Sequence, residues 1–163
     1  MIIKDLTVVT YDIEVFCNCF HCCCKDTETG ELYKFEISER KNQLTELVDF
    51  FYYTNTDRMF CGYNNHHYDD PIINYILDHR HIMMVKSIWE ICGSIFNLSR
   101  TITTSENTDP WKKWKYMHCF HSFDLLTILY SNKLRVALKE MQVTMHYNNV
   151  QEFVCDWQSN LPK

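Results

Sequence analysis

The sequence predicts an α/β fold with a mixed sheet, in which the elements follow in the order strand, strand, strand, helix, strand, helix (βββαβα). An apolar run rich in Val, Thr and Ile predicts the first strand at Leu6–Val15. Residues Phe16–Cys24 predict a second strand, and the turn at Asp26–Gly30 leads into a third strand at Glu31–Ile37. We therefore expect the first three strands to form an antiparallel meander.

A helix, a strand and a second helix are expected after the meander. Apolar residues spaced i, i+3, i+4 and i+7 predict a helix over Lys41–Tyr53, and Met59–Tyr63 predicts a short buried strand. Asp70 and Pro71 are residue types favoured at a helix N-cap and in a first helical turn. The apolar face expected of this second helix consists of Ile72, Ile73, Ile76 and Leu77.

The remaining part of the chain gives weaker patterns. The polar stretch Thr101–Pro110 predicts a long surface loop. Tyr116–Leu126 predicts a strand that leads into a helical region, and Ala137–Met145 predicts a further helix. A length of 163 residues with a 46% apolar share suits a single core, so we expect one domain over residues 1–163, flanked by helices on its sheet.

Composition limits the class of protein. The formal net charge of −5 argues against binding of nucleic acid through bulk electrostatic attraction, because such proteins carry a basic excess. Nine cysteines without regular spacing favour a reducing cytoplasm over a disulfide framework. The first residues do not resemble a signal peptide, and no run of 18 apolar residues exists. We therefore expect a soluble cytoplasmic protein with no membrane partner.

Two carboxylates, Asp12 and Glu14, stand near the end of the first strand. Residues two apart on a strand point to the same face, which places these carboxylates about 7 Å apart. Their hard oxygen atoms suit Mg²⁺. Burial of such a pair in a sheet is costly unless the carboxylates meet cations or lie at the exposed end of the strand. The pair is a candidate metal site, although an Asp-x-Glu pair by itself is also common on ordinary solvated strands.

A second polar group occupies the sequence GYNNHHYDDP at residues 62–71, where a strand leads into a helix. We interpret Asp70, next to Pro71, as the helix cap. Asp69 is then free to point toward Asp12 and to complete a pocket of three carboxylates. The alternative is that Asp69 and Asp70 are both ordinary turn residues.

Together these residues resemble the DEDD superfamily of 3′-to-5′ exonucleases, the DnaQ-like proofreading domains with a ribonuclease H-like fold. The first motif of that superfamily, Asp-x-Glu after an apolar strand, is similar to Tyr11–Glu14. The second, Asn-x-x-aromatic-Asp, is similar to Asn65–Asp69. A later apolar-Asp-Leu segment that opens a helix is similar to Phe123–Leu126, followed by Leu138–Met141. The likeness is greatest to the exonuclease domain of bacteriophage DNA polymerases and covers most of the chain.

The resemblance implies a catalytic site with two divalent ions, Mg²⁺ or Mn²⁺, held by Asp12, Glu14 and Asp69. Asp12 would bridge both ions, Glu14 would hold the ion that carries the attacking water, and Asp69 would hold the other directly or through water. Single-stranded DNA or a DNA 3′ end is the implied substrate, and a DNA polymerase domain or subunit is the implied partner. A phage-encoded protein of this kind would act in the host cytoplasm.

The resemblance also implies four contacts with substrate. Val15 and Phe16 resemble the apolar wedge that packs on the terminal base, whereas the alternative for both is packing in the core. Asn65 and Tyr68 are expected to contact the terminal nucleotide. The alternative for Asn65 is a hydrogen bond to the backbone of its own turn.

The last motif of the superfamily is a Tyr or His followed four residues later by Asp on a C-terminal helix, and the end of this chain has no counterpart to it. Neither His146 nor Tyr147 has an Asp at that spacing. Three explanations stay open: the chain is a piece truncated before its last catalytic helix, its activity has been lost, or a partner completes the site. The alternative function is therefore a catalytically inactive module that binds single-stranded DNA or a polymerase partner.

Two further patterns suggest other kinds of site. Cys19 and Cys22 have the spacing of zinc ligands with His21 between them, which would indicate a zinc-stabilised interaction protein. On a strand, however, alternate residues face opposite sides, which favours packing of these cysteines as small apolar residues. Trp111–Lys115 interleaves aromatic and basic residues, as surfaces that bind single strands do, or anchors the end of a loop.

Overall fold

The computed structural model describes residues 6–53, 57–104 and 119–130. The chain divides into two compact units, residues 1–125 and 126–163, and only residues 126–130 of the second unit are described. The predictions for Ala137–Met145 and Trp111–Lys115 lie outside the described residues, and the expectation of a single domain stays a prediction. Among the helices within those three ranges, none is long and apolar enough to cross a membrane.

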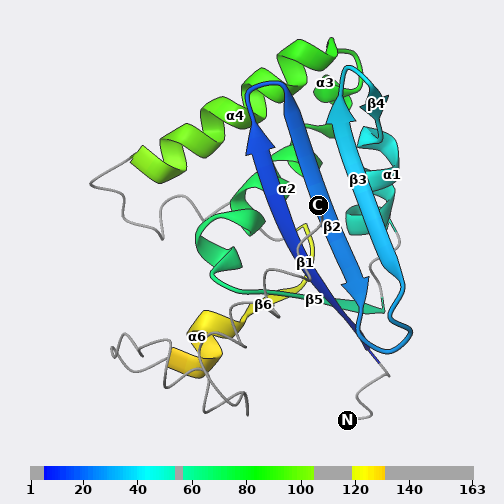
Figure 1. Cartoon of the computed structure of the whole chain (residues 1–163), viewed down its shortest axis with the longest axis vertical. Coiled ribbons are helices and arrows are strands. Elements are labelled where there is room, and N and C mark those ends of the chain that lie inside the picture. The colour runs from blue at the N-terminus through cyan, green and yellow to red at the C-terminus, as the bar shows by residue number, and fades with distance from the viewer. Residues whose placement is uncertain (1–5, 54–56, 105–118, 131–163) are drawn as a thin grey trace. The chain divides into compact units, whose positions relative to one another are not determined.

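The first unit is built on a mixed sheet of six strands in the order β4-β3-β2-β1-β5-β6 (Figure 1). Strands β1 to β4 pair antiparallel with their neighbours, and β5 and β6 extend the sheet in parallel on the other side of β1. The predicted α/β fold with a mixed sheet and an antiparallel meander is therefore confirmed. The strands are β1 (Thr7–Phe16), β2 (Cys19–Asp26), β3 (Leu32–Ser38), β4 (Lys41–Asn42), β5 (Arg58–Gly62) and β6 (Ser122–Asp124).

The two hairpin turns determine the register of the meander. Phe16, predicted to open the second strand, is the last residue of β1 and pairs with Cys19 across a turn of two residues. In the β2–β3 turn, Asp26 Oδ1 accepts the backbone N–H groups of Glu28 and Thr29, both at 2.8 Å. Gly30 completes this turn with a φ of 75°, a conformation that favours glycine.

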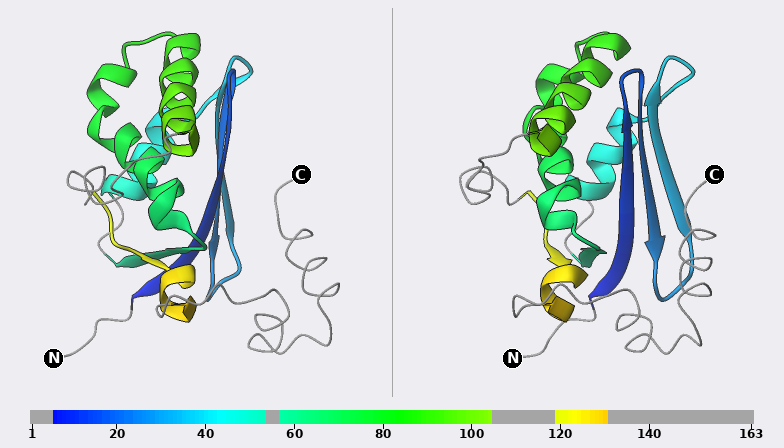
Figure 2. Two further views of the ribbon diagram at one scale, coloured as in Figure 1. Left: turned by 90° about the vertical axis from the view of Figure 1, so that its left-hand side faces the viewer. Right: turned by 60° about the vertical axis from the view of Figure 1, so that its left-hand side comes forward.

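Helices α1, α2 and α4 lie on one face of the sheet (Figure 2). The helix predicted from Lys41 starts later, at Leu44, because Lys41 and Asn42 pair with the end of β3. The four residues predicted to form the apolar face of α2 are all fully buried. The helical segments are α1 (Leu44–Val48), η1 (Asp49–Tyr53), η2 (Asn65–His67), α2 (Asp69–Asp78), α3 (Arg80–Met83) and α4 (Ile88–Thr104), and α6 (Leu125–Tyr130) begins at the unit boundary.

The longest helix of the described residues, α4, was not predicted from the sequence. Its buried residues Ile91, Cys92, Ile95 and Ser99 recur at helical spacing, which is the signal that could have found it. The surface loop predicted from Thr101 is wrong for Thr101–Thr104, which form the last turn of α4. The rest of that predicted loop lies outside the described residues.

The core lies between the sheet and the helices. Alternate residues of β1, namely Val9, Tyr11 and Ile13, are buried there, and the Tyr11 ring makes edge contacts with Phe51, Phe60 and Phe120. The intervening residues Asp12, Glu14 and Phe16 are exposed on the other face, which we call the open face. In the described part of the chain, no helix covers the open face beside these residues (Figure 2).

Candidate functional site

The carboxylates of Asp12 and Glu14 lie on the open face of β1, near the carboxyl end of the strand. Both residues are exposed, whereas Ile13 between them is 4% exposed and packs in the core. Their neighbours across β2 are Cys23 and His21. The alternation expected of a strand thus places both carboxylates on one face, where they are exposed to solvent.

Asp69 comes to the same end of β1 because β5 is shorter than β1. The parallel pairing between the two strands ends where Thr10 meets Cys61, so beyond this point no strand of the described residues pairs with this edge of β1. The chain turns at Asn64, whose φ of 60° is left-handed, and then starts α2 next to this edge. Asp69 Oδ1 accepts the backbone N–H of Ile13 at 3.2 Å. The third carboxylate is thereby fixed beside the strand segment that carries Asp12 and Glu14.

Burial, followed by the charge of a neighbouring carboxylate, raises the pKa values of two of these carboxyl groups. Burial, then the charge of Asp12, raises the pKa of Asp69 to about 7, and the Ile13 N–H partly opposes this rise. The Asp12 side chain reaches the surface, but surrounding protein still displaces part of its water. This partial burial, then the charge of Glu14, raises the pKa of Asp12 to about 6. After burial, the groups with the largest effect on both pKa values are a neighbouring carboxylate and the Ile13 N–H, and neither is a cation.

The donor chemistry of this cluster fits a hard divalent cation. All three side chains offer carboxylate oxygens, and a cation would offset both the burial and the repulsion that raise the pKa values of Asp12 and Asp69. As they stand, no three His, Cys, Asp or Glu side chains among the described residues converge on one metal position. Asp12 and Glu14 are exposed, so their side chains have room to turn toward a cation.

Asp70 does not cap α2, so that prediction is wrong. The helix already includes Asp69, and the Asp70 side chain, 5% exposed, points into the core. It accepts hydrogen bonds from the Tyr11 hydroxyl, from Asn65 Nδ2 at 3.0 Å and from Ser122 Oγ at 2.5 Å. Burial raises the pKa of Asp70 to about 7; the charge of Asp124 adds to this rise and the Ser122 hydroxyl opposes it.

The bond between Tyr11 and Asp70 joins the direct neighbours of two candidate ligands. Tyr11 precedes Asp12 on β1, and Asp70 follows Asp69 on α2. Beneath the carboxylates on the open face there is thus a buried polar network that links β1 and α2. Because Tyr11 and Asp70 are covalently joined to Asp12 and Asp69, this network restricts the distance between the backbones of the two candidate ligands.

Asp124 is a supporting residue whose role the sequence did not reveal. It ends β6 with 1% exposure, and its two carboxylate oxygens accept the backbone N–H groups of Asn64, at 2.8 Å, and His66, at 3.3 Å. These bonds hold the turn between β5 and α2. The sequence showed Asp124 only as part of a segment that opens a helix, which α6 confirms. A charged residue between Phe123 and Leu125 was the available signal for a second, anchoring role.

The four predicted substrate contacts differ in where they lie. Phe16 is 56% exposed on the open face with Asp12, whereas Val15 packs partly buried against the core. Asn65 is fully buried, and its amide donates to Asp70 and to the Tyr11 hydroxyl, so in this structure it is a part of the core network. The Tyr68 side chain is half-buried, and its hydroxyl lies 2.8 Å from Ser99 Oγ.

Tyr68 also lies within electrostatic range of the carboxylates. Burial raises the pKa of its phenol, and the charges of Asp69, Glu14 and Asp12 raise it further, while Ser99 opposes the rise. A contact of Tyr68 or Val15 with nucleotide stays a prediction.

The cysteines of β2 do not form the shared zinc site considered from their spacing. Cys22 and Cys24 are buried on the core face, with their sulfur atoms 3.7 Å apart, whereas Cys19 and His21 belong to the open face. Alternation along the strand separates Cys19 from Cys22, as expected.

No protein-family model, curated protein sequence or solved structure matches this chain. The side chains gathered between β1 and α2 are therefore the basis for a proposal about function.

Proposed function

We propose that this chain is a metal-dependent 3′-to-5′ exonuclease of the DEDD type on a ribonuclease H-like fold, which hydrolyses phosphodiester bonds at DNA 3′ ends. The observation that carries this proposal is the hydrogen bond from the Ile13 N–H to Asp69. It connects the two sequence motifs at one point of the fold, 56 residues apart along the chain. The order of the motifs supports a role as a domain or piece of a bacteriophage DNA polymerase.

Asp12, Glu14 and Asp69 would hold Mg²⁺ or Mn²⁺. When bound, such ions supply Lewis acidity toward a phosphodiester and toward the water that attacks it. Asp12 and Asp69 must lose their protons before they can act as ligands, and their raised pKa values place this event between about pH 6 and 7. Protons and metal ions therefore compete for the same oxygens.

The surroundings of the carboxylates suit the end of a single strand. Phe16 presents an exposed ring two residues beyond Glu14 on the same face, where it can pack on a terminal base. With a formal net charge of −5, the protein gains little from general attraction to phosphates. Binding would then depend on the metal ions and on contacts with bases.

The test is degradation of a 5′-labelled single-stranded DNA by the purified chain with Mg²⁺ or Mn²⁺. We expect a metal-dependent ladder that shortens from the 3′ end. Asp12→Asn and Asp69→Asn should each reduce the rate more than about a hundredfold, because changes even beyond the direct ligands of a metal alter activity by about 10- to 100-fold. Glu28→Gln, a matched change in the exposed β2–β3 turn, should cleave like the wild type.

Circular dichroism should show that every variant is folded. Absence of cleavage by the folded wild-type chain would reject the exonuclease. Binding of the labelled strand without cleavage would instead support the alternative, an inactive exonuclease-like module that binds single-stranded DNA or a polymerase partner. Wild-type activity in Asp12→Asn would show that another site cleaves the strand.

A further inference from the structure

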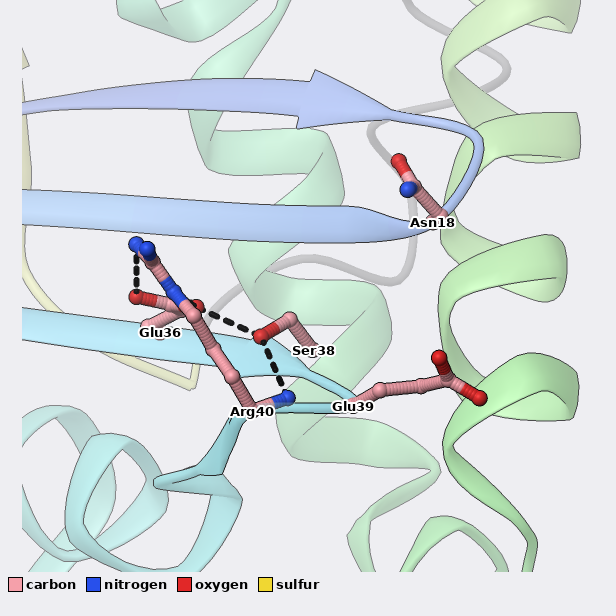
Figure 3. A pocket seen from close by; sticks show the side chains of 5 residues that line it. All are labelled: Asn18, Glu36, Ser38, Glu39 and Arg40. Carbon is pink, nitrogen blue, oxygen red and sulfur yellow. Dashed lines mark hydrogen bonds and ion pairs between the residues drawn. The ribbon is translucent and has the colours of Figure 1, made fainter.

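A pocket of about 270 Å³ lies between two turns of the sheet (Figure 3). Asn18, from the β1–β2 turn, forms one side. The end of β3 and the following turn form the rest, with Glu36, Ser38, Glu39 and Arg40. The metal-site proposal uses none of these residues.

Hydrogen bonds among the lining residues fix one wall of the pocket. Arg40 binds Glu36 through both arms of its guanidinium group, Nε to Oε1 at 2.6 Å and Nη2 to Oε2 at 2.8 Å. Ser38 Oγ donates to Glu36 Oε1 at 2.5 Å and accepts the backbone N–H of Arg40 at 3.2 Å. These bonds lower the pKa of Glu36 to about 2. Arg40 is therefore held in one orientation, although its side chain is 82% exposed.

Several polar groups around this wall still have bonding capacity. Arg40 Nη1 and Asn18 Nδ2 donate to no described residue. Glu39 accepts the indole N–H of Trp89 on Oε1 at 2.6 Å, which leaves Oε2 as an acceptor. Trp89 is 57% exposed, so this bond fixes an exposed aromatic ring next to Glu39.

This combination selects a flat and neutral ligand. Glu36 and Glu39 set two negative charges against the single positive charge of Arg40, which disfavours a phosphate group. Donors and an acceptor around a pocket of this size match the polar edge of a nucleobase. Trp89 does not line the pocket, and its indole N–H holds the Glu39 carboxylate.

The pocket opens on the same face of the sheet as the candidate metal ligands. Glu14 lies opposite His21, which lies opposite Glu36, so Glu14 and Glu36 belong to one row across three strands. Two strand spacings separate them, or about 10 Å. A single strand with its 3′ end at the carboxylates can therefore extend across β2 to the pocket.

Resting on the proposed exonuclease function, we propose that this pocket binds a nucleobase upstream of the 3′ terminal nucleotide of the same strand. Two variants test this without a change of net charge. Asn18→Ala removes one hydrogen-bond donor. Arg40→Lys keeps the positive charge but removes the guanidinium group and its Nη1 donor. The matched controls, Asn97→Ala and Arg100→Lys, change exposed residues of α4.

The assay is fluorescence anisotropy of the full chain with a 5′-fluorescein-labelled thymidine dodecamer in Ca²⁺. The same strand is also prepared with one abasic nucleotide at each of the four positions nearest the 3′ end. We expect Asn18→Ala and Arg40→Lys to weaken binding about three- to tenfold, the loss of roughly one hydrogen bond. The controls should bind like the wild type. At one abasic position, wild type and both pocket variants should bind equally, because the base that the pocket holds is missing.

Two results would overturn the pocket alone: pocket variants that bind the intact strand like the wild type, or the same weakening on every abasic strand. Cleavage that still needs Asp12 would then show that the proposed exonuclease stands. If the wild-type chain bound none of the strands, the pocket proposal would fall, and the cleavage assay would decide the exonuclease separately.

Discussion

Removal of the Tyr11 hydroxyl should destabilise the fold in a way that depends on pH. In Tyr11→Phe the ring keeps its contacts with Phe51 and Phe60, at centroid distances of 5.7 and 6.0 Å, so little cavity forms. What is lost is the hydrogen bond to Asp70 and the weaker one from Asn65 at 3.3 Å. A hydrogen bond to a charged group contributes about 1.5–3 kcal/mol, and one between neutral groups about 1 kcal/mol.

Because the pKa of Asp70 is about 7, its carboxyl group is mostly charged at pH 8 and mostly protonated at pH 5.5. With the Asn65 bond lost at both pH values, we therefore expect the Tyr11→Phe variant to lose about 3 kcal/mol at pH 8 and about 2 kcal/mol at pH 5.5. Urea denaturation of the metal-free chain at both pH values measures this difference.

Tyr68→Phe provides the matched control. Its hydroxyl bonds the neutral Ser99, so its removal should cost about 1 kcal/mol at both pH values. An equal loss at pH 5.5 and pH 8 in Tyr11→Phe would refute the reasoning, as would a loss below about 0.5 kcal/mol at pH 8. Either result would mean that the charged form of Asp70 does not depend on the Tyr11 hydroxyl.

Buried carboxylates should also make the metal-free fold more stable in mild acid. The pKa of Asp69 is about 7 when folded against an ordinary 3.8, so between these values the folded state binds more protons than the unfolded state. The unfolding free energy should fall by up to about 4 kcal/mol as the pH rises from 4 to 7. Asp69→Asn should flatten this dependence in urea titrations, and an unchanged slope would contradict the assignment. Mn²⁺ should raise the Tm more at pH 8 than at pH 6, because protons compete for Asp12 and Asp69. Asp12→Asn should remove most of this rise in calorimetry, so equal shifts in variant and wild type would count against the metal site. Gly62→Ala should cost about 1–3 kcal/mol, because its new Cβ would lie 2.6 Å from the Cβ of Asn65. Gly93 lies in α4, and a Cβ added there would meet no atom within 4 Å apart from its chain neighbours and its own helix backbone. Gly93→Ala should therefore stabilise by up to about 1 kcal/mol, and equal unfolding midpoints for the two variants would disprove the steric argument.

Local patterns in the sequence were sufficient for the elements that local preferences control. The Val- and Thr-rich run predicted β1, and strand alternation predicted that Asp12 and Glu14 share a face. Helical spacing predicted the buried face of α2. The same spacing was present in α4, so its omission reflects a missed pattern and not a limit of the sequence.

Other errors had a physical cause outside the local sequence. Nothing near Lys41 indicates a strand, because β4 exists only through its pairing with the end of β3. Hydrogen bonds to a neighbouring strand outweighed the helical preference of this segment, and the helix starts at Leu44 instead.

The identity of the candidate site was determined by the sequence, and the separate roles of its neighbouring residues by the tertiary structure. Asp69 and Asp70 are chemically identical, and residue type favoured Asp70 as a cap. Only their long-range partners distinguish them. Asp69 accepts the backbone N–H of Ile13, beyond the point where β1 pairs with β5. Asp70 accepts hydrogen bonds from the hydroxyl groups of Tyr11 and Ser122 in the core. These contacts join residues more than 50 positions apart in the chain, so no local preference encodes them, and packing of α2 against β1 decides which carboxylate lies beside Asp12.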